Sequence, residues 1–173
     1  MCARKSTMNH EYFMGKALEL ARRALDRGEF PVGCVMVHQG EIIATGTRKY
    51  TRGDAKNEID HAEMIALRRL SEQTEDIDRG KVIVYCTMEP CLMCLAAIVI
   101  SGIRNIVYAY EDVMGGGTSC NLTLLKPLYS RSPISILPDI GRNRSLALFK
   151  AFFANPQNDY WQNSLLARYT LDQ

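Results

Sequence analysis

The hydrophobic pattern begins with apolar side chains that recur every three or four residues over 11–27, which predicts an amphipathic helix. Gly28 suits the position that follows the end of such a helix. Two short β-prone runs come next, at 34–38 and 42–46. The residues between them, 39–41, include a glycine and can form a turn, so the two runs predict a β-hairpin.

Beyond a polar stretch that predicts a long loop, 47–60, helical patterns alternate with the patterns of buried strands. The order helix, hairpin, helix, strand, helix, strand predicts an α/β fold in which a mixed sheet carries helices on its faces. The pattern weakens after a glycine-rich loop at 111–119. The remaining predicted elements are helices at 61–70, 91–101, near 122–128, 145–154 and 160–169, and strands at 81–87, 105–110 and 134–137.

Length and composition fit one globular domain over 1–173, with a divergent C-terminal segment from about 120. Hydrophobic residues are 47% of the 173 and charged residues 23%, which is not the composition of a disordered chain. The longest unbroken apolar run, 94–100, is much shorter than the ~20 residues of a membrane span, so no membrane association is expected. The polar N-terminus carries no secretory signal, and we therefore expect a cytoplasmic protein whose thiols stay reduced.

Two short motifs contain residues that bind metals. The first is His61-Ala62-Glu63, and the second is Pro90-Cys91-Leu92-Met93-Cys94. Cys91 and Cys94 are three apart on a predicted helix, so their sulfurs lie on one face of its positive N-terminal turn, where thiolates are favoured. One imidazole and two thiolates make a three-ligand zinc site with a fourth position left for water.

Glu63 is the candidate catalytic residue. It stands two residues after His61, so both side chains emerge at the start of one predicted helix and point in different directions. A carboxylate there is placed to take a proton from a zinc-activated water and to pass it to a ring nitrogen and a leaving amine. The pattern thus indicates hydrolytic deamination.

Two other interpretations of the cysteines remain open. A structural zinc site would need a fourth ligand, and Cys34, Cys86 and Cys120 are available. A redox-active cysteine pair would also use two cysteines at this spacing, although it needs no upstream His-x-Glu motif.

Three stretches, 30–37, 61–68 and 85–98, resemble the cytidine deaminase-like superfamily, and the likeness extends over roughly 11–119. Within that superfamily the chain is similar to the tRNA adenosine deaminases of bacteria and to guanine deaminases. The resemblance implies a three-layer α/β/α sandwich around a five-stranded mixed sheet, one zinc ion per chain, and a homodimer.

The substrate is expected from the same resemblance. It implies deamination of adenosine to inosine at the wobble position of tRNA. Guanine or another free purine or nucleoside is the next alternative, followed by cytosine or cytidine, and a structural zinc module or an inactive deaminase subunit is the non-enzymatic one. The resemblance places four residues at the substrate: Phe30, Ala62, Glu89 and Asp112. For Asp112, capping of its own loop is an equally good interpretation.

Arg48 is a departure from the family, whose purine-specific members carry an asparagine near this position. It is a candidate substrate contact, and because a guanidinium offers donors and no acceptor, base preference can differ here. Asn57, further along the same loop, is the candidate substitute for the missing asparagine.

Charge is uneven along the chain. Residues 1–112 hold 15 basic and 16 acidic side chains, whereas 113–173 hold 6 and 3. Arg142, Arg144 and Lys150 therefore form either a phosphate-facing strip or a solvated helix face. Trp161 is a candidate lid over the active site.

Overall fold

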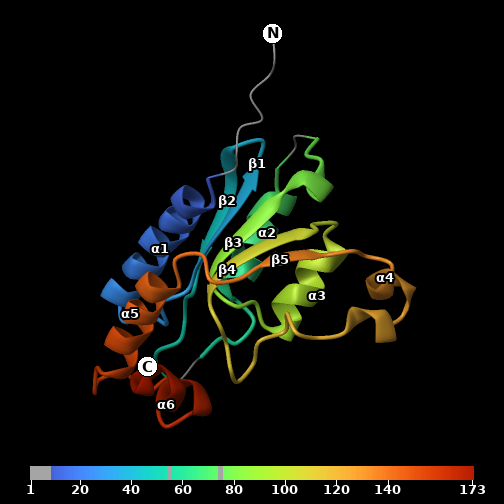
Figure 1. The fold of residues 1–173 in the computed structure, drawn as a ribbon. Coiled ribbons are helices and arrows are strands. Elements are labelled where there is room, and N and C mark those ends of the chain that lie inside the picture. Colours follow the sequence, from blue (N-terminus) through green and yellow to red (C-terminus); the bar gives the residue numbers. More distant parts are fainter. Residues whose placement is uncertain (1–8, 54–55, 74–75) are drawn as a thin grey trace.

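The computed structural model describes residues 9–53, 56–73 and 76–173. Its five strands form one mixed sheet in the order β2-β1-β3-β4-β5 (Figure 1). β1 pairs antiparallel with β2 and β3, while β3–β4 and β4–β5 pair in parallel. The strands are β1 (Gly33–His38), β2 (Glu41–Thr47), β3 (Ile83–Met88), β4 (Asn105–Tyr110) and β5 (Ser135–Leu137). This is the expected five-stranded mixed sheet.

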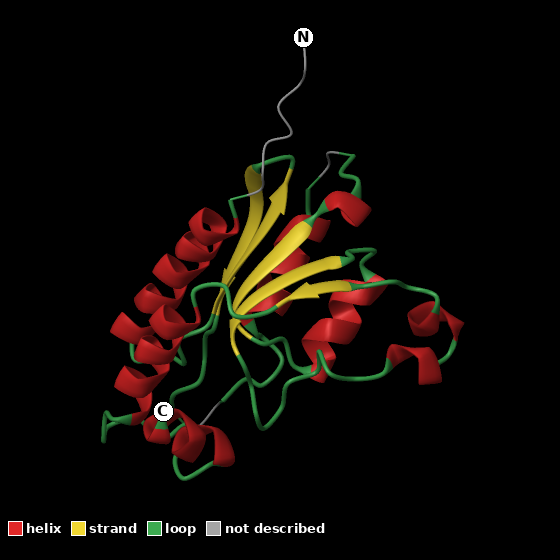
Figure 2. Cartoon of the chain, in the orientation of Figure 1, coloured by secondary structure: helices red, strands yellow, loops and turns green. Residues whose placement is uncertain are grey.

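Helices cover both faces of the sheet, as Figure 2 shows. α1 (His10–Asp26) and α5 (Arg142–Phe153) lie on one face, and α2 (Ala62–Ser71) and α3 (Leu92–Ile100) lie on the other. Successive residues of a strand point to opposite faces of the sheet, so each strand contributes side chains to a hydrophobic core on either face. On β1, Val35 packs toward α1 and Met36 toward α2. The three-layer α/β/α sandwich is thus confirmed.

The C-terminal part belongs to the same sandwich. α5 sends Phe149 and Phe152, both fully buried, into the larger core, and α6 (Leu165–Asp172) packs against α5. α6 contributes the buried Leu166 to that core. Among the described residues no helix is both long and apolar enough to cross a bilayer.

The boundaries of the C-terminal elements differ from the predicted ones. The helix predicted at 160–169 is wrong in its first half, because Trp161 and Asn163 adopt positive φ angles and Ser164 caps a helix that begins only at Leu165. α5 starts at Arg142, three residues early, behind Gly141 with a φ of 75°. The helix predicted near 122–128 is a 3₁₀ turn, η2 (Leu122–Leu124), and one turn of helix, α4 (Pro127–Ser130).

Two smaller shifts bear directly on the site. α2 and α3 each begin one residue later than predicted, so His61 and Cys91 are N-cap residues with extended backbone. The strand predicted from 81 starts at Ile83, after a 3₁₀ turn, η1 (Arg79–Lys81).

Candidate metal centre and active site

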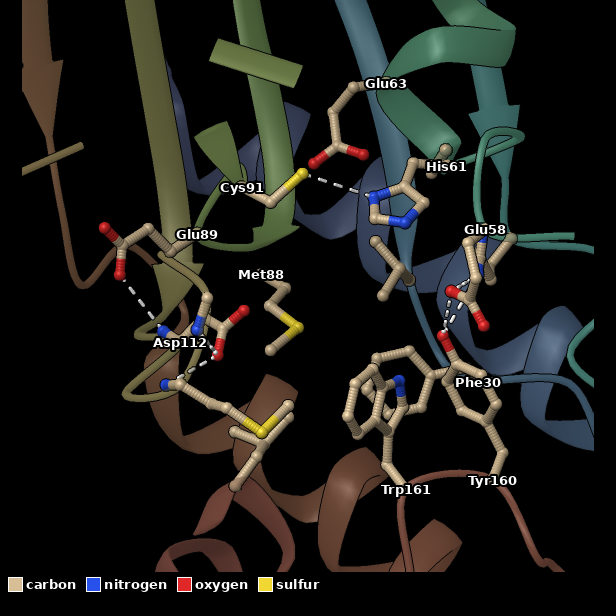
Figure 3. A pocket seen from close by; sticks show the side chains of 16 residues that line it. Phe30, Glu58, His61, Glu63, Met88, Glu89, Cys91, Asp112, Tyr160 and Trp161 are labelled. Carbon is tan, nitrogen blue, oxygen red and sulfur yellow. Dashed lines mark hydrogen bonds and ion pairs between the residues drawn. The ribbon is translucent and has the colours of Figure 1, made fainter. Parts of the chain in front are cut away.

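The candidate ligands meet where α2 and α3 begin, at one end of the sheet. His61 caps α2, Cys91 caps α3, and Cys94 follows within the first turn of α3. The Nδ1 atom of His61 lies 3.5 Å from each of the two sulfurs, and the three ligand atoms all lie within 4.8 Å of one another. Figure 3 shows Cys91 and His61 facing each other across the site.

These distances suit zinc. Tetrahedral coordination with Zn–S of about 2.3 Å and Zn–N of about 2.05 Å separates a sulfur from a nitrogen by about 3.6 Å. The observed 3.5 Å between His61 Nδ1 and each sulfur agrees with that value. A histidine and two cysteines therefore fit a zinc ion that keeps one coordination position for water.

The other candidate ligands lie elsewhere. Cys34 and Cys86 face each other on β1 and β3, with their sulfurs 3.9 Å apart, and both are fully buried. Cys120 is exposed and lines a different cavity, beside η2. Within the described ranges, the only cluster of possible metal ligands is the one at His61, so no fourth cysteine closes the site.

A hydrogen bond couples the pKa values of the two ligand cysteines. The hydrogen bond from Cys94, aided by His61, outweighs burial and lowers the pKa of Cys91 to about 4. The same bond, together with burial, raises the pKa of Cys94. Cys91 is thus a thiolate at neutral pH, ready to bind a cation, and a divalent ion would displace the remaining proton from Cys94.

Glu63 lies beside the ligands. Its side chain is only 3% exposed, and Oε2 is 3.6 Å from the sulfur of Cys94. Burial raises the pKa of Glu63, although its backbone hydrogen bond and His61 act in the opposite direction. A carboxyl group in this environment accepts a proton more readily than one in water.

A cavity of about 240 Å³ opens next to this cluster. It lies beyond the carboxyl ends of the parallel strands β3 and β4, the place where open α/β sheets generally bind ligands. Its volume is below the ~300–1,000 Å³ of pockets for drug-sized molecules and suits one base-sized ring system. The lining residues are Phe30, Val32, Arg48, Glu58, His61, Ala62, Glu63, Met88, Glu89, Cys91, Asp112, Met114, Gly115, Tyr160, Trp161 and Leu166.

All five residues that the sequence placed at the substrate border this cavity: Phe30, Arg48, Ala62, Glu89 and Asp112. Their contact with a substrate stays a prediction. Phe30 forms an aromatic wall, packed edge-on against Tyr160 with ring centroids 5.3 Å apart.

Glu89 and Asp112 hold the glycine-rich loop in place. Glu89 Oε1 accepts bonds from the amide and hydroxyl of Thr118, and Oε2 accepts from the Asp112 amide. Asp112 Oδ1 accepts from the amides of Met114 and Gly115, which is the loop-capping arrangement. Loop capping is therefore what Asp112 does in this structure.

Arg48 is buried, with 2% of its side chain exposed. One guanidinium nitrogen donates to Glu58 at 2.8 Å and to the hydroxyl of Tyr160 at 3.0 Å. Asn57 is not among the residues that line the cavity. Its side chain instead accepts from the amides of Ile59 and Asp60, holding the turn that leads into His61.

Two of the three cations of the predicted phosphate-facing strip, Arg142 and Arg144, are paired with carboxylates. Arg142 donates twice to Glu111 and lies over the ring of Tyr110, while Arg144 donates to Glu11 at 2.5 Å. Both arginines are therefore neutralised by carboxylates. Arg142 is three-quarters buried rather than part of a solvated face.

Several cavity residues carried no recognisable sequence signal. Glu58 and Tyr160 are 102 residues apart and meet through a hydrogen bond of 2.8 Å. Met88, Met114 and Leu166 are ordinary apolar positions in the sequence. No local pattern marks such residues, because their roles depend on contacts across the fold.

Residues 7–110 match the sequence model of the cytidine and deoxycytidylate deaminase zinc-binding region. The chain belongs to this family. Its membership confirms the expected zinc cofactor and an enzyme that hydrolyses the C–N bond of a nucleobase amine.

The relatives include tRNA-specific adenosine deaminases. That of Aquifex aeolicus is 36% identical over 110 residues, a region spanning 64% of this chain and 72% of the relative. The tRNA-specific adenosine deaminase 2 of Danio rerio is 39% identical over 111 residues, spanning 61% of this chain and only 51% of the relative.

Solved structures agree on the fold. A structure from a study of tRNA:A34 deaminases superposes with a TM-score of 0.65 at 30% identity, covering 79% of this chain and 98% of the other. Guanine deaminase from Bacillus subtilis is 35% identical with a TM-score of 0.54, covering 60% and 66%. A protein in complex with 2,6-diaminopurine gives 0.69 at 23% identity over 87% and 85%, which supports the fold alone.

Proposed function

We propose that this chain deaminates adenosine to inosine at the wobble position of tRNA. The observation that carries the proposal is the buried Glu63 beside a three-ligand zinc site, at the wall of a cavity that suits one base. The tRNA-specific adenosine deaminases among the relatives support tRNA as the substrate.

The chemistry divides between the metal and the protein. His61, Cys91 and Cys94 would hold the zinc ion, which supplies a water whose pKa is lowered toward ~7. The Glu63 carboxylate takes the two protons of the attacking water one after the other, delivers the first to the ring nitrogen and the second to the amine, and the amine leaves as ammonia. The net reaction exchanges the amine for a carbonyl oxygen at the cost of one water molecule.

The cavity walls orient the base. Phe30 and Trp161 offer aromatic faces, and the Ala62 backbone at the start of α2 lies beside Glu63. Because the lining is largely apolar, a base that enters displaces water, and the polar groups at the zinc site then act in a medium of low dielectric constant.

Glu63→Gln tests this function. The variant should bind one zinc per chain and lose at least ~10²–10⁴-fold in turnover, because an amide cannot carry the proton. Inosine formation in a tRNA transcript and zinc content are measured together. Glu19→Gln, on the exposed surface of α1, is the matched control and should behave as the unsubstituted chain. Full activity of Glu63→Gln would refute the assigned role.

A second candidate is deamination of a free purine such as guanine. It is favoured by the wall that Tyr160, Trp161 and Leu166 build over the cavity, and by the pairing of Arg142 and Arg144, which leaves few cations for RNA phosphates. Ammonia release from guanine, with tRNA adenosine left unchanged, would decide for this candidate.

The non-enzymatic interpretation has its own outcome. A chain with full zinc content that releases no ammonia from tRNA or from any free base would be a structural zinc module or an inactive deaminase subunit. The buried position of Glu63 speaks against it, because a buried carboxyl group is costly to keep without a function.

We further propose that the chain is a cytoplasmic homodimer. Exposed apolar side chains lie on α3, at Leu92 (56%) and Ile100 (57%), and on η2 and α4, at Leu124 (82%) and Leu128 (60%), and α4 packs against both α3 and η2. Burial of these side chains between two copies would stabilise a dimer. Leu124→Glu should then yield monomers in analytical ultracentrifugation, and an unchanged mass would contradict this choice of interface.

The chain is also proposed to fold as one domain over 1–173. Phe149 and Phe152 of α5 share the larger core with residues of β3 and α3, so the two parts of the chain should not unfold separately. Two separate calorimetric transitions would contradict this.

A further inference from the structure

The loop that leads to His61 is fastened to the segment before α6, above the cavity. Arg48 donates to Glu58 at 2.8 Å and to the Tyr160 hydroxyl at 3.0 Å, and that hydroxyl donates to Glu58 at 2.8 Å. These three residues form a closed triangle of hydrogen bonds, which we call the latch. It joins two segments that are more than a hundred residues apart in the sequence.

The latch holds the two segments together strongly because one of its members, Arg48, carries a buried charge. Arg48 is 2% exposed, whereas Glu58 is about half exposed. A buried guanidinium without a partner is unfavourable, so Arg48 strongly favours the arrangement in which Glu58 and Tyr160 are both in reach. The Arg48 guanidinium also lies 5.8 Å from the centroid of the Tyr160 ring.

Trp161 follows Tyr160 in the chain and connects the latch to the cavity wall. Its ring lies edge-on to that of Tyr160, with centroids 5.7 Å apart, and lines the cavity while remaining 44% exposed (Figure 3). Its φ angle is +56°, a conformation that bulky residues rarely adopt unless the surrounding contacts hold them there.

Two further contacts hold the same segment without touching the cavity wall. Asn158 donates to the carbonyl of Phe152 at 2.8 Å, and Lys56 pairs with Asp159 at 3.0 Å. The first fixes the segment to α5, and the second is an exposed ion pair of small energy. The latch is therefore the strongest tie between the segment and the loop around the cavity.

We propose that Arg48 is a positioning residue that, through Glu58 and Tyr160, holds the Trp161 ring as the wall on which the substrate base stacks. This rests on the proposed function, since it assumes that a base enters this cavity. It gives the arginine that replaces the family's asparagine an indirect role. A stacking wall at Trp161 also restricts the ligand to a flat heteroaromatic ring. An indole face binds any such ring, whatever hydrogen-bonding groups the edge of the ring carries.

The unliganded protein offers the first test, because Trp161 is the only tryptophan in the chain. Tyr160→Phe removes the latch hydroxyl, and Arg48→Lys keeps the charge but loses the planar fork. Both should shift tryptophan emission to longer wavelengths as the ring becomes more solvated. Tyr169→Phe, which removes a hydroxyl bonded to Glu111 away from the cavity, is the matched control and should leave emission unchanged.

Ligand binding offers the second test. In a Glu63→Gln background, an anticodon stem-loop with adenosine at the target position should quench Trp161 emission. Tyr160→Phe and Arg48→Lys should each weaken this binding by about tenfold, as expected for a lost hydrogen bond to a charged group. With Glu63 present, KM should rise by a similar factor while kcat changes little.

Two results would overturn the proposal. If Tyr160→Phe binds normally and only Arg48→Lys is weakened, Arg48 contacts the substrate directly. If neither variant shifts the emission, other contacts hold Trp161. A chain that deaminates neither tRNA nor free guanine would refute the proposed function instead, and the emission of the unliganded variants would still decide on the latch.

Discussion

Gly46→Ala should damage the fold and the zinc site together. Gly46 lies on β2, where the strand touches the first turn of α2. A Cβ atom at this position would lie 1.9 Å from the carbonyl oxygen of Ala62 and 2.9 Å from the amide nitrogen of Ala66. Both are backbone atoms, so the clash cannot be relieved by rotating a side chain. The helix start that carries His61 and Glu63 must move instead.

The magnitude follows from this geometry. Overpacking of a core by one methyl group usually costs about 1–3 kcal/mol, and a clash with backbone places this variant at the upper end. For a protein of this size, each kcal/mol lowers Tm by about 2–4 °C, so we expect a fall of about 6–12 °C. Displacement of the Ala62 backbone also moves the neighbouring ligand His61, so zinc content should fall below one per chain.

The assay compares two identical chemical changes. Gly15→Ala adds the same methyl group inside α1, where the nearest atom is 3.9 Å away, and should raise stability by about 0.5–1 kcal/mol through helix propensity. Thermal melts and metal analysis are run on both variants. A Gly46→Ala protein that melts within a degree of the parent and keeps its zinc would refute the reasoning. Equal destabilisation by Gly15→Ala would do the same.

Three further perturbations test other parts of the site. Glu89→Gln leaves one acceptor oxygen for a loop that uses two, so it should lower the free energy of unfolding by about 1–3 kcal/mol in a urea melt. Removal of zinc with a chelator should abolish deamination and lower Tm, and added zinc should restore both, while Cys91→Ser should not be restored. Burial raises the pKa of Glu111, but bonds from Arg142 and Tyr169 outweigh it and lower the pKa below its ordinary 4.5. The ion pair between Arg142 and Glu111 therefore stabilises the fold fully above pH 4.5, and this stabilisation disappears as the pH falls through the lowered pKa of Glu111. Arg142→Ala should then destabilise the fold more at neutral than at acid pH.

The zinc site could be predicted because its determinants are local. His61 and Glu63 are neighbours, and Cys91 and Cys94 are three apart, so the motif fixes which side chains share a helix start. The sheet was predictable for a similar reason, since runs of β-prone residues mark strands wherever they pair. Only the ends of these elements shifted, by one or two residues.

The C-terminal segment from about 120 could not be predicted equally well, because its structure depends on distant contacts. The apolar spacing over 160–169 is compatible with a helix, yet Trp161 and Asn163 adopt left-handed backbone conformations. Tyr160 is bonded to Arg48, 112 residues away, and α6 begins only after the cap at Ser164. Propensity is a weak signal, and tertiary contacts override it.

These two parts of the chain divide the work of the enzyme between the chemical step and binding of the base. The match to the family model ends at residue 110, and every side chain assigned to zinc binding or proton transfer lies before that point. The part beyond it contributes Tyr160, Trp161 and Leu166 to the cavity wall. The latch joins the two parts at Arg48, where the sequence resemblance predicts a departure from the purine-specific pattern. Glu58 pairs with the buried Arg48 charge from the same loop, and the Tyr160 hydroxyl adds the bond that reaches the C-terminal part. Binding of the substrate base is therefore expected to change with the latch, and the rate of the chemical step with Glu63.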